Sequence, residues 1–337
     1  MAGSGWGVDA EREALLELVD SLAGKWPEPG GENRADHPAE HPAEHPAEDS
    51  LSAAQRDLAD RGLWAMGLPE ACGGGDADPA TTRAVIARVS GHRPALGLVM
   101  AQLHAAGAAL ATAHPELLAV AAEGGSIGVA EACGELGLAG VPRIDLGAAA
   151  GDLVLLTEQG CLLAPAATVT LGPAVRRTGL DGMSSGPAEI DTAGLERLDV
   201  DADQVRARLL AGQLAVAAGL ADAASRHARR YAAERVQFGA PLDRLPTMRD
   251  RLAELAGHAA ALIGLAVRAD IPAADAPVLL RDALDRAIDA GRLAVQSLGG
   301  YGYLEEYPVA RLFRDAVSLR AAADVDPLAH RSVVAAS

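Results

Sequence analysis

The longest stretch of helical character in this sequence, from about residue 203 to 235, constrains the fold most. Its apolar residues recur at helical spacing, and two more segments of the same kind follow, "TMRDRLAELAGHAAALIGLAVRA" and "AADAPVLLRDALDRAIDAGRLAVQSLGG". The last of these ends at Gly299–Gly300, a pair typical of a helix stop. Consecutive long helices predict a helical bundle domain, which we assign to residues 201–337.

The preceding part of the chain contains two regions with different sequence patterns. Residues 124–200 contain short Val/Leu/Ile runs split by Gly, Pro and Asp, which predicts a small, reduced β domain. Residues 1–123 predict an N-terminal helical domain that begins with an amphipathic helix over 9–24. Inside it, three copies of His-Pro-Ala-Glu predict a disordered loop at 32–49, because proline every fourth residue prevents a helix. The expected fold class is therefore mainly α with a small β domain in the middle.

Composition excludes several classes of protein. Half of the residues are apolar but only 3% are aromatic, so burial must come from Ala, Leu and Val. The formal net charge of −17 disfavours a nucleic-acid partner. We see no signal peptide and no uncharged apolar run of membrane-spanning length, which predicts a cytoplasmic protein without a membrane partner. The three cysteines are far apart and are expected to be small buried apolar residues, and we expect no metal site.

The stretch "AVQSLGGYGYLEEYPVARLFRDA", residues 294–316, contains three of the four tyrosines and one of the two phenylalanines. Together with "YAAERVQFGAPLDRLPTMRDRLAEL" and "LADRGLWAMGLPEACGGG", it resembles the acyl-CoA dehydrogenases, and the order of helices, β unit and helices matches as well. The resemblance implies oxidation of an acyl-CoA thioester to the 2,3-enoyl-CoA. In that family FAD accepts the β-hydride, a glutamate removes the α-proton, and each flavin lies at an interface between two subunits.

Five residues match family positions that contact a flavin bound mainly by the neighbouring subunit. Arg235 matches the arginine at the FAD pyrophosphate, where a guanidinium can bond phosphate oxygens bidentately. Gln237 and Phe238 match residues beside the same cofactor. Gln296 and Gly300 match the glutamine and glycine near the adenosine–pyrophosphate region. The resemblance thus implies FAD shared at a subunit interface.

Other motifs of the family are missing. The segment "VAEACGELGLAGVPRIDLGAAAGDLVLL" has Glu131 in place of a Thr-Glu-Pro glutamate, but no Gly-Ser-Asp and no Trp-x-Thr strand follows. The two positions that hold the catalytic glutamate in family members are Ala323 and Leu209 here, with Asp324 adjacent to the first. Alanine and leucine cannot accept a proton. We therefore predict no catalytic residue in this chain.

The chain keeps the residues that match contacts to a neighbour's flavin, but it lacks the motifs that would hold its own flavin and the catalytic glutamate. This pattern favours a subunit that contributes flavin contacts to a catalytic, acyl-CoA dehydrogenase-like partner chain in a hetero-oligomer. Such complexes act in bacterial breakdown of steroid side chains, so the resemblance implies lipid metabolism and a bulky acyl-CoA substrate. Two alternatives remain open. One is a self-sufficient homodimer that uses Asp324 or Glu131 as the base. The other is a flavin-free binding or assembly module, or a non-redox biosynthetic enzyme, on the same scaffold.

The remaining residues of the tyrosine-rich stretch are expected to be structural. Tyr301, Tyr303 and Tyr307 should pack together or line an interface, and Arg314 should form an ion pair with Asp315.

Overall fold

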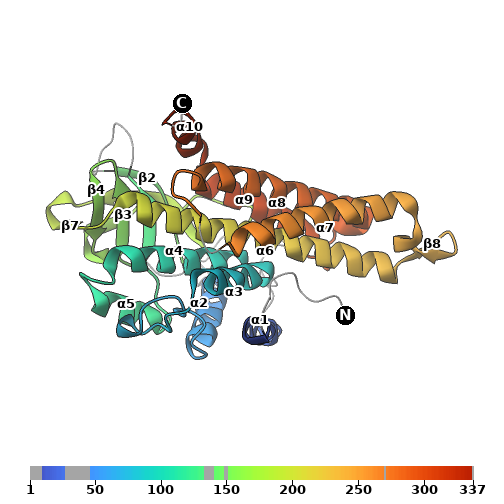
Figure 1. The fold of residues 1–337 in the computed structure, drawn as a ribbon, viewed down its shortest axis with the longest axis horizontal. Helices are drawn as coiled ribbons and strands as arrows, with labels where there is room; N and C mark the ends of the chain where they lie inside the picture. The colour runs from blue at the N-terminus through green and yellow to red at the C-terminus, as the bar shows by residue number, and fades with distance from the viewer. Residues whose placement is uncertain (1–9, 27–45, 133–139, 148–150, 269–270, 336–337) are drawn as a thin grey trace, which may run out of the picture.

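A computed structural model describes residues 10–26, 46–132, 140–147, 151–268 and 271–335 of this chain. It contains an N-terminal group of helices, two small sheets and a C-terminal helical bundle, in that order along the chain (Figure 1). The predicted fold class, mainly α with a small β region, is confirmed.

The bundle is organised around α6, a helix of 33 residues from Ala202 to Glu234 that runs along most of the molecule (Figure 1). Its N-terminus is capped by the side chain of Asp201, which accepts a hydrogen bond from the backbone N–H of Asp203. The other helices of this part are α7 (Pro246–Ala266), α8 (Ala276–Leu298), α9 (Val309–Ala323) and α10 (Asp326–Ala335).

Small residues allow α6 to pack closely against the N-terminal helices. A side chain at Gly219 would overlap the carbonyl oxygen of Ala87, and a Cβ at Gly212 would lie 2.6 Å from the Cβ of Ala101. Close helix contact therefore fills much of the core of a sequence that has few large aromatic side chains. The N-terminal elements are α1 (Ala10–Ala23), α2 (Pro46–Ala59), η1 (Glu70–Cys72), α3 (Pro79–His92), α4 (Pro94–Leu110) and α5 (Pro115–Ala122).

The structure differs from the sequence prediction at α2. This helix begins at Pro46, so residues 46–49 are helical although the predicted disordered loop extended to residue 49. Proline is tolerated in the first turn of a helix, where its missing N–H has no intrahelical partner to lose. The rest of the predicted loop, including the histidines of the repeat, lies outside the described residues.

The strands form two sheets in addition to a short hairpin at the far end of the bundle. The four-stranded sheet has the order β1-β3-β4-β7, with β1 and β3 parallel, and the three-stranded sheet has the antiparallel order β2-β6-β5. The strands are β1 (Gly128–Glu131), β2 (Gly140–Leu146), β3 (Leu153–Thr157), β4 (Gly160–Ala164), β5 (Val169–Leu171), β6 (Ser184–Ile190) and β7 (Glu196–Leu198).

Strand β3 connects two hydrophobic cores because successive side chains of a strand point to opposite faces. Val154 and Leu156 belong to the large core shared with the helices, whereas Leu153 and Leu155 belong to a second core between the two sheets. All four side chains are buried. The uniform apolar character of this strand therefore reflects burial on both faces.

At the opposite end of the molecule, α6 and α7 are joined by the hairpin of β8 (Val236–Gln237) and β9 (Ala240–Pro241) and by η5 (Leu242–Arg244) (Figure 1). The short helix η6 (Gly299–Tyr303) follows α8 and precedes α9. Within the described residues, no helix has the length and hydrophobicity that crossing a bilayer requires. Cys72 and Cys161 are buried free thiols, as predicted, and Cys133 lies outside the described residues.

Candidate functional site

The five residues predicted to contact a cofactor belong to the two segments 235–241 and 296–303, which we call the bundle tip. Helices α6 and α8 end at the same end of the bundle, so Arg235, which follows α6, lies beside η6, which follows α8. The Arg235 guanidinium carbon is 5.1 Å from the ring centroid of Tyr301. On α7, Arg251 Nη1 donates to the backbone oxygen of Gln296 at 3.3 Å. Residues far apart in sequence thus meet at one end of the bundle.

Arg235 lies beside a cluster of three tyrosines at the bundle tip, and its guanidinium contacts one of them, Tyr301. The rings of Tyr231, Tyr301 and Tyr307 form a mutual cluster with centroid separations of 5.8 to 6.2 Å. Edge-to-face aromatic contacts stabilise such clusters, and a guanidinium over the face of a tyrosine ring is attracted to it. Burial raises the pKa of Tyr231. The expectation that the tyrosines pack together is met by Tyr301 and Tyr307, whereas Tyr303 is 77% exposed.

Phe238 is the most unusual residue of the bundle tip. It forms the two-residue turn between β8 and β9 with Gly239, and both residues have positive φ, 55° and 81°, the combination found in type I′ hairpin turns. A left-handed conformation is unfavourable for a bulky residue, and the ring is 90% exposed. Neither the backbone conformation nor the packing of this chain accounts for a phenylalanine at this position.

Gln296 and Gly300 are also exposed at the bundle tip. A Cβ at Gly300 would meet no atom within 4 Å, so nothing in this chain requires a glycine at that position. By contrast, a Cβ at Gly302 would lie 2.5 Å from the backbone oxygen of Val295. The open space at Gly300 is compatible with a ligand that approaches the backbone closely.

The two positions that the sequence resemblance matches to a catalytic glutamate carry no ionisable side chain. Leu209 is buried within α6 and is 6% exposed. Ala323 is the last residue of α9, and Asp324 caps that helix in a left-handed conformation with φ of 39°. Asp324 is exposed.

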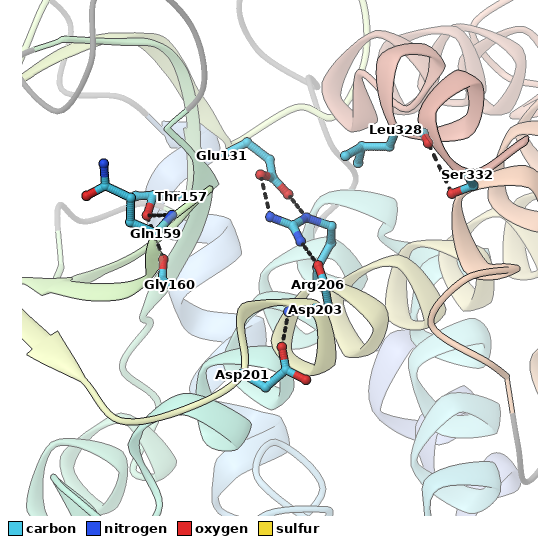
Figure 2. A network of polar contacts seen from close by, with 9 residues as sticks. All are labelled: Glu131, Thr157, Gln159, Gly160, Asp201, Asp203, Arg206, Leu328 and Ser332. Carbon is cyan, nitrogen blue, oxygen red and sulfur yellow. Dashed lines mark hydrogen bonds and ion pairs between the residues drawn. The ribbon is translucent and has the colours of Figure 1, made fainter. Parts of the chain in front are cut away.

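Glu131, the other candidate base, is engaged in an ion pair with Arg206 of α6 (Figure 2). Arg206 Nε and Nη2 donate to the two carboxylate oxygens of Glu131 at 2.6 and 3.1 Å, and Nη1 also donates to Asp203. Both partners are largely shielded from solvent. A bidentate guanidinium stabilises the charged, proton-free carboxylate and occupies both of its oxygens. Sequence reasoning missed Arg206 because it lies 75 residues from Glu131.

The predicted ion pair between Arg314 and Asp315 is wrong. Asp315 is 2% exposed and accepts a 2.7 Å hydrogen bond from the backbone N–H of Leu180, while Arg314 Nε donates to the backbone oxygen of Thr178. Burial raises the pKa of Asp315 to about 6. Adjacent residues on a helix point in different directions, so each one reaches a separate point of the loop at 178–180.

Comparisons with known proteins agree with the resemblance deduced from the motifs. Residues 204–323 match the family model described as acyl-CoA dehydrogenase, C-terminal domain. The chain is 36% identical over 163 residues to an acyl-CoA dehydrogenase of Bacillus subtilis (strain 168), which covers 44% of this chain and 43% of that protein. It is 40% identical over 112 residues to a short-chain-specific acyl-CoA dehydrogenase of Megasphaera elsdenii, which covers 31% of this chain and 29% of that protein.

The similarity in structure extends further than the similarity in sequence. The butyryl-CoA dehydrogenase of Megasphaera elsdenii aligns with 98% of this chain and 98% of its own length, at a TM-score of 0.78 and 18% identity. A glutaryl-CoA dehydrogenase of Mycobacterium smegmatis in complex with FADH2 aligns with 98% of this chain and 95% of its own, at a TM-score of 0.78 and 14% identity. The sequence matches thus span less than half of the curated relatives, and the whole-chain likeness is one of fold.

Proposed function

We propose that this protein is a non-catalytic subunit of an FAD-dependent acyl-CoA dehydrogenase. Residues 204–323 match the C-terminal domain model of that family, and the whole chain has the acyl-CoA dehydrogenase fold. In this proposal it pairs with a catalytically complete, acyl-CoA dehydrogenase-like chain. Its bundle tip reaches across the subunit interface and contacts the flavin there.

The observation that supports this proposal most directly is the outward display of the bundle tip. Phe238 is 90% exposed in a left-handed turn, and open space surrounds Gly300. Arg235 is held beside Tyr301 at the same end of the bundle. A guanidinium, an exposed aromatic ring and an approachable backbone together suit the diphosphate and adenosine parts of a dinucleotide. They fit FAD presented by another chain.

The second line of support concerns the general base that would remove the α-proton of the substrate. Removal of an α-proton needs an ionisable group within hydrogen-bond reach, and Leu209 and Ala323 have none. Glu131 is bound to Arg206 through both oxygens. The base would therefore come from the partner chain. When bound, FAD supplies the hydride acceptor, and the role of this chain is to anchor the cofactor's diphosphate and close the interface.

We extend the proposal to the substrate in general terms. An acyl-CoA thioester would bind to the partner chain, and a site with one catalytic and one non-catalytic subunit leaves room for a bulky acyl group. A steroid-derived thioester is one such substrate, which would place the complex in lipid metabolism. The proposed location is the cytoplasm.

The decisive experiment is co-expression with an acyl-CoA dehydrogenase-like partner, followed by measurement of bound FAD and of dichlorophenolindophenol reduction with acyl-CoA. We expect flavin and activity in the complex and neither in the isolated chain. Arg235→Ala should lower the flavin affinity of the complex roughly tenfold or more, the effect of losing a charge-assisted bidentate contact. Arg292→Ala, at an arginine that is 59% exposed on α8, is the matched control and should change nothing.

Each alternative has a distinct result in the same experiment. A yellow isolated chain that acyl-CoA bleaches, and that Glu131→Gln inactivates, would establish the self-sufficient homodimer instead. A complex that keeps its flavin and its activity unchanged in Arg235→Ala would favour the flavin-free binding or assembly role.

A further inference from the structure

A second feature of the bundle lies on another face of α6, in the groove between α6 and α7. It is a surface pocket of about 560 Å³ lined by Arg226, Arg229 and Arg230 of α6, by Asp243 of η5, and by the apolar side chains of Ala233 and Leu252. Its volume falls within the range of small-molecule sites. The arginines and Ala233 follow the spacing i, i+3, i+4, i+7, so they share one face of the helix.

This face differs from the one that forms the bundle tip. Tyr231 and Arg235 are four residues apart on α6 and face Tyr301 of η6. The pocket residues instead face η5 and α7. The pocket is therefore separate from the residues proposed to contact a flavin.

The charges of the pocket do not cancel. Arg226 Nε lies 3.1 Å from Asp222 Oδ2, and Asp243 Oδ1 lies 3.8 Å from Arg244 Nε, so these carboxylates have cationic neighbours of their own. Arg229 has no ion-pair partner within the described part of the chain. Arg230 donates through Nη2 to His227 Nδ1 at 3.2 Å. Two exposed guanidinium groups without carboxylate partners thus face a concave surface, in a chain whose net charge is −17.

The protonation state of His227 is consistent with the same local positive potential. Burial and the nearby Arg230, Arg226, Arg311 and His92 lower its pKa to about 4. The imidazole is therefore neutral at neutral pH, and its Nδ1 can accept the hydrogen bond from Arg230. This contact holds the guanidinium group of Arg230 without neutralising its charge.

We propose that this pocket binds a phosphorylated small molecule, with its phosphate or diphosphate held by Arg229 and Arg230 and its organic part against Leu252. Guanidinium groups match phosphate oxygens in geometry and charge, and they are weakly hydrated, so they bind phosphate without a metal ion. Asp243 also lines the pocket, and its Oδ1 accepts no hydrogen bond in the described structure. None of the five residues proposed to contact a flavin lines this pocket.

The test uses the full-length chain with pyrophosphate and ADP as probes, titrated by calorimetry at low ionic strength. Both probes should bind, ADP more tightly because it also contacts the apolar wall. Arg229→Glu and Arg230→Glu should each weaken ADP binding roughly tenfold or more, since each replaces an attractive charge with a repulsive one. Both residues are exposed, so these variants should fold normally. Arg61→Glu, at an exposed arginine remote from the pocket, should bind like the unmodified chain.

Three results would overturn the proposal. One is the absence of binding by either probe at millimolar concentration. Another is unchanged affinity in Arg229→Glu and Arg230→Glu. The third is loss of binding in Arg235→Ala with retention in the two pocket variants, which would assign the anion to the bundle tip. Because flavin retention by the complex is a separate measurement, the two proposals can fail independently.

Discussion

The carboxylate of Asp315 on α9 accepts a hydrogen bond from the backbone N–H of Leu180 at 2.7 Å, across 135 residues of sequence. Leu180 itself has a positive φ of 58° and is 1% exposed. The loop that contains it is therefore held in an unfavourable conformation by contacts with the bundle. This contact joins the sheet region to the C-terminal helices.

The first prediction concerns the pH dependence of stability. Burial raises the pKa of Asp315 to about 6 in the folded protein, above the ordinary value of 3.8. The folded state therefore binds this proton more tightly than the unfolded state does. Its stabilising contribution is complete below about pH 4 and is lost as the pH rises toward about 6, a change of about 3 kcal/mol.

Asp315→Asn should remove this pH-dependent contribution to the free energy of unfolding, while the asparagine side chain keeps an acceptor for the Leu180 N–H. Urea unfolding of both proteins between about pH 4 and 7 measures the effect, and the variant should gain stability relative to the unmodified chain as the pH rises. Parallel stability curves for the two proteins would contradict the assignment.

The second prediction concerns Gly179, which lies against the backbone of α9. A Cβ at this position would lie 2.6 Å from the Arg314 carbonyl oxygen and 2.7 Å from the Asp315 nitrogen. Gly179→Ala should therefore destabilise the protein by about 1–3 kcal/mol, because backbone atoms cannot move aside as a side chain can. Gly300→Ala is the matched control, since a Cβ there would meet nothing within 4 Å. Equal melting temperatures for the two variants would refute this reasoning.

The third prediction separates stability from function at Phe238. Asparagine tolerates the left-handed conformation better than phenylalanine, and Asn-Gly is a preferred pair for this turn. Phe238→Asn should therefore stabilise the isolated chain by about 0.5–1 kcal/mol in chemical denaturation. It should also weaken association with a catalytic partner, which can be followed by analytical ultracentrifugation.

Val236→Asn provides the control for that experiment, because Val236 is also exposed, at 56%, but has no positive φ. It should not stabilise the chain. A Phe238→Asn variant that is less stable than the unmodified chain would show that the ring is held by contacts within this chain.

The fourth prediction concerns the contact between Arg235 and Tyr301, whose groups are 5.1 Å apart. A double-mutant cycle with Arg235→Ala and Tyr301→Leu, measured by unfolding of the isolated chain, should give a coupling of about 0.5–1 kcal/mol. Tyr301→Phe retains the ring face and should preserve most of that coupling. A coupling indistinguishable from zero would mean that Tyr301 does not position the guanidinium.

Much of this protein could be deduced from the sequence alone, because the relevant information is local. The helical spacing of apolar residues predicted α6, α7 and α8, and the short runs split by Gly and Pro predicted the strands between residues 128 and 198. The motifs around Arg235 and Gly300 gave the resemblance to the acyl-CoA dehydrogenases, and the C-terminal domain model of that family matches residues 204–323. The absence of a base at Ala323 and Leu209 follows from residue identity, since neither side chain can ionise in any fold.

Only the tertiary structure decided which distant side chains meet. Glu131 and Arg206 are 75 residues apart, and Asp315 reaches Leu180 instead of the adjacent Arg314. The arginines of the α6–α7 groove form a pocket only because the hairpin returns α7 alongside α6. Such contacts depend on helix packing and on the direction of each side chain, which the local sequence pattern does not encode. The sequence by itself therefore determined the helices and strands and the residue types at the matched positions, and packing determined the partners of the charged residues.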